Sequence, residues 1–439
     1  MQYSLPITTV RAALLGGALL TTFSTAVATD WTEGHGDIAA NHVAGEWRFG
    51  VLIDSFPGTE FAPHEVLIKA GDNARLAIPA GPNFSFLGIV GDPVWVYPQS
   101  QAAGVPFVGI SAEATPLGTF VNDRFNLELE SVAGPGDFFL WTTGGTGTPT
   151  VRMNSADGIS AADVFDVPSG GHNHVNWGFS SPGTYRVRVK GVGTLTGQPT
   201  PTASEEAVYT FEVSVIKAGE VDLEVAYHDG ELEFHLHDET TDTEFEPAHV
   251  ALQAGPATWT TVPAEAAFGF LGAPGEHRYI LPQDEQEGVQ FLGLAAGEVP
   301  AGTFVDDELK VQLCAVSGPG SVFYYEVDGF GAPMVFFDSA DGLTTDDAVA
   351  VAVGSHSHRN WAFSAPGVYR VTLVASGELT GGGTVTSEPA TFLFEVLPPR
   401  FFDRGEVDLE VVFEDGVFEL ELLDEAAGRE YAAHEAVLV

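Results

Sequence analysis

The chain has 439 residues, two to three times the usual size of one domain, so more than one hydrophobic core is expected. Its 61 acidic and 17 basic residues give a formal net charge of -44, which repels the phosphates of nucleic acid and the surface of an anionic membrane. Nucleic acids and anionic membranes are therefore excluded as expected partners. Because 44% of the residues are hydrophobic, the acidic charge belongs to a folded protein and not to a disordered tail.

The first segment of the chain, residues 1–28, has the pattern of a secretory signal peptide. Arg11 precedes an apolar run that extends from Ala12 to about Leu20, and small residues end the segment at Ala28. We therefore expect the mature protein to be exported. With a single cysteine, Cys314, it cannot form an internal disulfide, so its stability must come from core burial and from any bound metal. Cys314 itself is expected to be a small buried side chain in a strand.

Two long repeats follow, because the chain matches itself at an offset of about 184 residues. The repeated words are Phe86-Leu87-Gly88, Pro98-Gln99, Gly118-Thr119-Phe120 and Gly134-Pro135-Gly136, with counterparts at Phe270, Pro282, Gly302 and Gly318. We expect copy 1 to span residues 29–217 and copy 2 residues 219–398. A third copy is expected to start at 405 and to be truncated at 439, so that any C-terminal anchor would lie beyond the sequence.

The predicted strands within each copy come from alternating apolar and polar residues. Leu232, Phe234 and Leu236 share one strand face, as do Tyr185, Val187 and Val189, and Gly, Pro, Asp and Ser turns recur about every ten residues. The sequence predicts an all-β protein of tandem β-sandwich domains, Ig-like or jelly-roll in style. A copy of this length fits either one elaborated sandwich or two small subdomains.

The longest repeated word, His-x-His-x-Asn-Trp, offers candidate metal ligands. In an extended segment His172 and His174 share one face, as do His356 and His358, while Trp177 points the other way. Imidazole nitrogens bind transition metals such as Zn²⁺ and Mn²⁺. The alternative is a polar strand face without metal. The aromatic residues of the word, including Trp177 and Trp361, are predicted to pack in the core.

Two histidines do not complete a metal site, so further ligands must come from elsewhere in the fold. Asp37 and Asp222, near the start of each copy, are the predicted ligands, and His35 and Glu220 lie beside them. The weaker candidates are His64, His249 and His434, which follow a shared Glu-aromatic word, and the pair His235 and His237 in copy 2.

The histidine word, together with the upstream Phe-Leu-Gly, Pro-Gln and Gly-Pro-Gly words, resembles the choice-of-anchor M domain, a surface-anchored repeat domain of actinobacterial wall proteins. The resemblance covers roughly residues 33–439. It implies a bacterial protein that is secreted or held at the cell surface, and it places the family's histidine word on His172, His174, His356 and His358. Because members are often encoded near metal-type ABC transporters, it also implies zinc or manganese handling, with such a transporter as a partner.

Three functions are compared. The first is a non-enzymatic exported repeat protein that binds a divalent transition metal at one site per copy and contacts an extracellular ligand or surface component. The second is a structural or adhesive surface protein without metal. The third, a metal-dependent hydrolase or a carbohydrate-binding module, has no supporting motif, since the sequence has no nucleophile elbow, phosphate loop or His-Glu-x-x-His helix. We therefore predict that the protein is not an enzyme.

Overall fold

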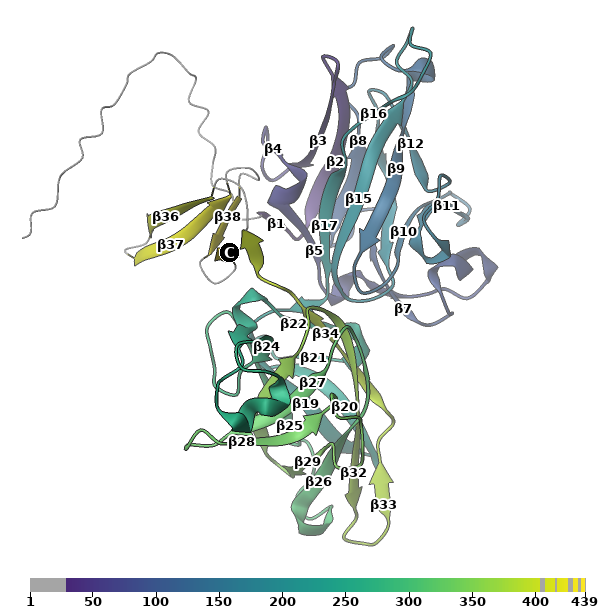
Figure 1. Cartoon of the computed structure of the whole chain (residues 1–439). Coiled ribbons are helices and arrows are strands. Elements are labelled where there is room, and N and C mark those ends of the chain that lie inside the picture. Colours follow the sequence, from purple (N-terminus) through teal and green to yellow (C-terminus); the bar gives the residue numbers. More distant parts are fainter. Residues whose placement is uncertain (1–28, 403–406, 415–416, 425–428, 433–435, 439) are drawn as a thin grey trace, which may run out of the picture.

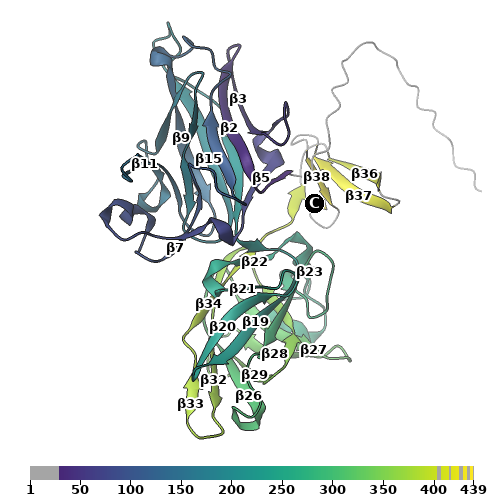
Figure 2. The same ribbon diagram turned by 180° about the vertical axis from the view of Figure 1, so that it is seen from behind.

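The computed structural model describes residues 29–402, 407–414, 417–424, 429–432 and 436–438. The predicted signal peptide, residues 1–28, and His434 lie outside these residues. Strands make up 53% of the structure and helices 9%. The prediction of all-β, sandwich-type domains is confirmed. Figures 1 and 2 show copies 1 and 2 as two bodies, with the short yellow strands of the third copy beside them.

Copy 1 contains one seven-stranded sheet and two five-stranded sheets, named here after strands β2 and β10. The seven-stranded sheet has the order β1 (Thr29–Trp31), β5 (Val66–Ala70), β17 (Ala207–Val213), β15 (Gly183–Gly193), β9 (Arg124–Ala133) and β12 (Val164–Pro168), with β16 (Thr202–Ala203) paired to β15. The β2 sheet has the order β13 (His172–His174), β8 (Pro106–Ser111), β2 (Gly34–Val43), β3 (Glu46–Ile53) and β4 (Glu60–Phe61). The β10 sheet has the order β11 (Pro149–Asn154), β10 (Phe138–Thr143), β14 (Asn176–Phe179), β7 (Pro93–Tyr97) and β6 (Arg75–Ala77).

Copy 2 repeats this arrangement, and its five-stranded sheets are named after β19 and β27. Its seven-stranded sheet has the order β18 (Val215–Ile216), β22 (Ala251–Ala254), β34 (Ala390–Val396), β32 (Gly367–Glu378), β26 (Glu308–Ser317) and β29 (Ala348–Ala352), with β33 (Thr384–Thr386) paired to β32. The β19 sheet has the order β21 (Thr243–Phe245), β20 (Glu231–Asp238), β19 (Gly219–His228), β25 (Gln290–Ala295) and β30 (His356–His358). The β27 sheet has the order β23 (Trp259–Thr261), β24 (His277–Leu281), β31 (Asn360–Phe363), β27 (Val322–Val327) and β28 (Pro333–Asp338).

The described strands of the third copy form two small sheets. They are β35 (Arg400–Phe402) with β39 (Ala436–Leu438), and β36 (Val407–Glu414), β37 (Val417–Asp424) and β38 (Arg429–Ala432). The helices are short 3₁₀ turns: η1 (Pro63–Glu65), η2 (Asp72–Ala74), η3 (Pro82–Leu87), η4 (Val121–Asp123), η5 (Ser155–Asp157), η6 (Pro247–His249), η7 (Pro256–Thr258), η8 (Ala266–Leu271) and η9 (Val305–Asp307). Within the described residues, no helix is long and apolar enough to cross a membrane.

Each copy has one main core, and this favours the elaborated sandwich over two subdomains. In copy 1, side chains from all three sheets form a single cluster: Ile38 and Ile110 of the β2 sheet, Trp177 of the β10 sheet, and Tyr185 and Phe211 of the seven-stranded sheet. Copy 2 has an equivalent cluster that includes the buried Trp361. A smaller cluster covers the other face of the β10 sheet under η3. The prediction that the aromatic residues of the histidine word pack in the core is confirmed.

The segment that carries the histidine word passes from one sheet to the next. Residues 172–174 pair with β8 in the β2 sheet, and residues 176–179 pair with β7 and β10 in the β10 sheet. The repeated Pro-Gln word helps to fix this crossing. The Gln99 side chain bonds to the backbone of Thr143 and accepts a hydrogen bond from Asn176, and Gln283 does the same with Val327 and Asn360 in copy 2.

The chain passes from the seven-stranded sheet of copy 1 to that of copy 2 at Ser214. β17 ends copy 1 at Val213, whereas the next strand, β18, pairs with β22 of copy 2. Ser214 adopts a positive φ of 46°, which turns the chain from one sheet to the other.

The prediction of a buried Cys314 is wrong. Because Leu309, Val311 and Leu313 face the core, the alternation of the strand places Cys314 outward, at a bulge in the pairing of β26 with β32.

A buried carboxylate joins the two copies. Glu395 on β34 accepts hydrogen bonds from the backbone and hydroxyl of Thr184 in copy 1, at 3.0 and 2.8 Å, and from Gln253 at 2.9 Å. Burial raises the pKa of Glu395, and these hydrogen bonds offset only part of that effect. The folded state therefore holds the Glu395 proton more tightly than the unfolded state does.

This raised pKa predicts a specific pH dependence. Stability contributed by protonation of Glu395 is present at low pH and is lost as pH rises through the unfolded and then the folded pKa. The free energy of unfolding of wild type, relative to that of Glu395→Gln, should therefore fall as the pH rises from about 4.3, the ordinary pKa of a glutamate, through the raised pKa of the folded state. Urea unfolding of both proteins across this range measures the difference, which would stay constant if Glu395 did not titrate in this window.

Candidate metal centre

The outer face of the β2 sheet carries the strongest candidate site. In β2 the side chains of Ile38 and Ala40 enter the core, so His35 and Asp37 project from the opposite face. The pairing register puts Asp37, Gly109 and His174 in one row across β2, β8 and β13. Ligands from two strands that are separated by β8 therefore face the same space.

A glycine in the middle strand allows these side chains to meet. Neighbouring strands lie about 4.8 Å apart, so β2 and β13 are separated by roughly 10 Å. A Cβ atom at Gly109 would overlap Oδ1 of Asp37 and would lie 3.1 Å from Nε2 of His172. Because Gly109 has no side chain, Asp37 and the histidines can lean over β8 from both sides.

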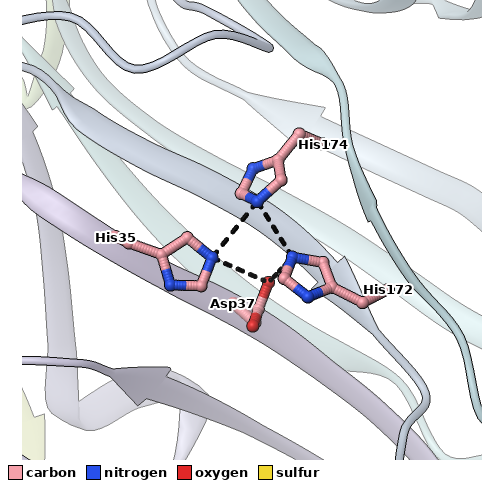
Figure 3. A group of neighbouring side chains, drawn as sticks. All are labelled: His35, Asp37, His172 and His174. Carbon is pink, nitrogen blue, oxygen red and sulfur yellow. Dashed lines mark hydrogen bonds and ion pairs between the residues drawn. The ribbon is translucent and has the colours of Figure 1, made fainter.

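Four ligand atoms converge above β8 (Figure 3). Nε2 of His174 lies 2.9 Å from Nε2 of His172 and 3.1 Å from Nε2 of His35. Oδ1 of Asp37 lies 3.2 Å from Nε2 of His172 and 4.0 Å from Nε2 of His35. A tetrahedral Zn²⁺ site with bonds of about 2.0–2.1 Å has ligand–ligand distances of about 3.3–3.4 Å. The four distances, from 2.9 to 4.0 Å, lie on either side of this value.

Hydrogen bonding alone does not satisfy this group. An imidazole nitrogen donates or accepts along one in-plane direction, so Nε2 of His174 can bond to only one of its two histidine neighbours. Oδ1 of Asp37 is buried and has no hydrogen-bond partner among the described residues. Such a buried oxygen is costly unless something compensates it. A cation at the centre would interact with all four atoms at once.

The protonation states suit metal binding. Burial, with the added effect of the nearby His172 and His35, lowers the pKa of His174 to about 4, so its imidazole is neutral at pH 7. Its ring is also held in place by stacking on Phe107, with ring centres 3.6 Å apart and planes 7° apart. Burial raises the pKa of Asp37, and His172 and His35 offset part of this rise. A bound cation would favour the ionised carboxylate in the same way.

An outer carboxylate orients one of the ligands. Oδ2 of Asp54 lies 3.0 Å from Nδ1 of His35. A carboxylate at this nitrogen retains the proton there and leaves the Nε2 lone pair for a metal, which is the usual arrangement around metal-binding histidines.

The contact between Asp54 and His35 predicts a moderate loss of zinc affinity when Asp54 is replaced. Asp54→Ala should weaken zinc binding to copy 1 by about 10-fold, at the lower end of the usual range for outer-shell partners because Asp54 is exposed. Competition titration with a chromophoric chelator measures the change. Asp92→Ala removes an exposed acid of the same charge from the loop before β7 and should leave the affinity unchanged. Equal effects of the two variants would assign the loss to net charge and not to the His35 contact.

Copy 2 has a related but different group. Glu220 occupies the place of His35, and its Oε1 lies 3.2 Å from Nε2 of His358 and 3.9 Å from Nε2 of His356. His358 stacks on Phe291, with ring centres 3.5 Å apart, and Gly293 again leaves room for Asp222. Oδ1 of Asp222 and both ring nitrogens of His358 are buried, with no hydrogen-bond partner of acceptable geometry among the described residues.

The structure brings most of the predicted ligands together. His172, His174 and Asp37 form one group and are completed by His35, which the sequence marked only as a neighbour. His356 and His358 group with Glu220, whereas Asp222 lies beside them but outside the group of mutually close ligand atoms. The groups found among the described residues do not include His64, His249, His235 or His237.

The residues that sequence reasoning missed are those of the middle strand. Phe107 and Gly109 recur as Phe291 and Gly293, a Phe-x-Gly word at the same repeat offset as the others. That repetition was available as a signal. The role of the Phe-x-Gly word could not be predicted, because no local pattern indicates that β8 lies between β2 and β13.

Comparisons with known proteins do not indicate a function for this chain. No protein-family model and no curated protein sequence matches the chain. Among solved structures, the secreted serine protease VesC from Vibrio cholerae aligns with 10% identity over 61% of this chain and 44% of its own length, with a TM-score of 0.09. A similarity this low carries no argument about fold or activity.

Proposed function

We propose that this protein is a non-enzymatic, exported metal-binding protein whose first copy holds one Zn²⁺ ion through His35, Asp37, His172 and His174. The observation that carries the proposal is the convergence of three imidazole nitrogens and one buried carboxylate oxygen without a hydrogen-bond partner, with neighbouring ligand atoms 2.9 to 4.0 Å apart. Three nitrogens and one oxygen are a donor set that zinc accepts readily and that manganese favours less.

The donor count also bears on enzyme activity. Catalytic zinc sites keep one position for water or substrate, whereas sites with four protein ligands are closed. The group in copy 1 supplies four protein ligands, which fits retention or transfer of the ion better than hydrolysis. The resemblance to surface-anchored repeat domains extends this proposal to metal handling outside the cell, with a metal transporter as the receiving partner.

Elemental analysis tests the proposal. Purified protein is stripped with a chelator, reloaded with Zn²⁺, dialysed and compared with His172→Ala/His174→Ala. We expect wild type to retain at least one equivalent and the variant to lose the equivalent that belongs to copy 1. His64→Ala, which removes an exposed histidine of copy 1, should keep it. If wild type retained no zinc, the structural or adhesive function would be the better one.

A further inference from the structure

The two sites differ in a way that points to different metals. They share two histidines, one glycine, one phenylalanine and one aspartate at matching register positions. The main change in the ligand groups is His35 in copy 1 for Glu220 in copy 2. Resting on the proposed function, we propose that the copies select different divalent cations: copy 1 binds zinc, and copy 2 binds a harder cation of the Mn²⁺ class.

The donor atoms support this division. The group in copy 1 offers three nitrogens and one oxygen, whereas that in copy 2 offers two nitrogens and the Glu220 carboxylate, with the Asp222 carboxylate beside them. Carboxylates favour Mn²⁺, and added imidazoles favour Zn²⁺. Replacing one imidazole by a carboxylate therefore shifts preference toward the harder ion, even though zinc remains the tighter binder at most mixed sites.

The ligands of the second site are also more exposed to water than those of the first site. The side chain of His172 is 28% exposed, and that of its counterpart His356 is 56% exposed. The side chain of Glu220 is 40% exposed, and that of His35, which it replaces, is 25% exposed. The site in copy 2 is therefore more open to water. A six-coordinate ion with water ligands fits such a site better than a four-coordinate ion does.

Acidic side chains near the second site also favour a hard cation. Glu220, Asp222 and Glu224 project from one face of β19, and the backbone N–H of Glu239, directly after β20, donates to the backbone carbonyl of Glu220 at 3.1 Å. In the strand itself the second site has the acidic Glu224, where copy 1 has Ala39. Beyond the ligands the two sites are alike, because Asp54 and Glu113 lie within 4 Å of the histidines of the first site.

Single-site proteins allow the two sites to be measured separately. His356→Ala/His358→Ala leaves only the first site, and His172→Ala/His174→Ala leaves only the second. Affinities for Zn²⁺ alone and for Mn²⁺ alone are measured for each, manganese by electron paramagnetic resonance and zinc by chelator competition. We expect the ratio of zinc affinity to manganese affinity to be at least 10-fold lower at the second site.

Exchanging the residue types at positions 35 and 220 then tests whether these residues cause the difference in metal preference. Glu220→His should raise this ratio at the second site by about 10-fold or more, and His35→Glu should lower it at the first. Glu220→Gln should weaken manganese binding without strengthening zinc binding, and circular dichroism in chelator checks that each variant is folded. Equal ratios at the two sites, swaps without effect, or a second site that binds neither ion would overturn the inference while the zinc site of copy 1 stands. If neither single-site protein bound metal, the proposed function itself would fail.

Discussion

Removal of bound zinc is expected to lower the thermal midpoint of copy 1 by about 8–16 °C. A ligand that binds only the folded state at about 1,000 times its Kd stabilises that state by about 4 kcal/mol. For a domain of this size each kcal/mol moves the midpoint by about 2–4 °C. The effect is expected to be this large because the unbound site leaves Asp37 Oδ1 buried without a partner and crowds three imidazole nitrogens together.

Scanning calorimetry of the full chain, in zinc and then in chelator, measures this shift. The transition that moves is assigned with His174→Ala, which should unfold at the same temperature in both solutions. His64→Ala is the matched control and should retain the full shift, since the exposed His64 lies on η1, outside the ligand group. A wild-type midpoint that did not respond to zinc would contradict the prediction.

Local periodicity predicted the strands and their faces well. Leu232, Phe234 and Leu236 do share a buried face, and His172 and His174 do project from the same short strand. These features depend only on the two-residue repeat of a strand, which can be read from neighbouring residues. The same rule, applied carefully, would have placed Cys314 outward.

The ligand set depended on pairings that no local pattern contains. His35 meets His174 because β2 pairs in parallel with β8, about 70 residues further along, and β8 then pairs with β13. A one-residue change of register would turn Asp37 into the core. The sequence therefore limited the candidates to repeated histidines and acids near each copy's start, and topology selected His35 over His64. The two copies also show that equal words do not imply equal sites, since Glu220 stands in the place of His35.

Truncation of Trp177 should strongly destabilise copy 1. Its side chain is buried, and its ring centre lies 5.4 Å from that of Phe211 on the opposite sheet. Replacing a buried tryptophan by alanine costs about 3–5 kcal/mol through lost burial and the cavity that remains. Urea unfolding of Trp177→Ala should show this loss in the transition assigned to copy 1, while the transition of copy 2 remains unchanged.

The two copies provide a matched pair for separating packing from hydrogen bonding. Nε1 of Trp177 donates to the carbonyl of Val108 at 3.2 Å, whereas Nε1 of Trp361 has no hydrogen-bond partner among the described residues. Trp177→Phe should therefore cost about 0.5–1.5 kcal/mol more than Trp361→Phe, the net worth of one such bond. Equal costs would show that the bond to Val108 contributes nothing measurable.

The same bond connects the core to the metal centre. Val108 lies between Phe107, on which His174 stacks, and Gly109, over which Asp37 leans. Trp177 thus holds β8 at the point where the ligands from β2 and β13 meet. Trp177→Phe should weaken zinc binding in copy 1 several-fold although it changes no ligand. Tyr185→Phe, a core change on the seven-stranded sheet whose hydroxyl donates to the carbonyl of Ser181, should not. Chelator competition on the folded variants distinguishes this effect from a general loss of stability, because a purely global effect would not depend on which core residue was changed.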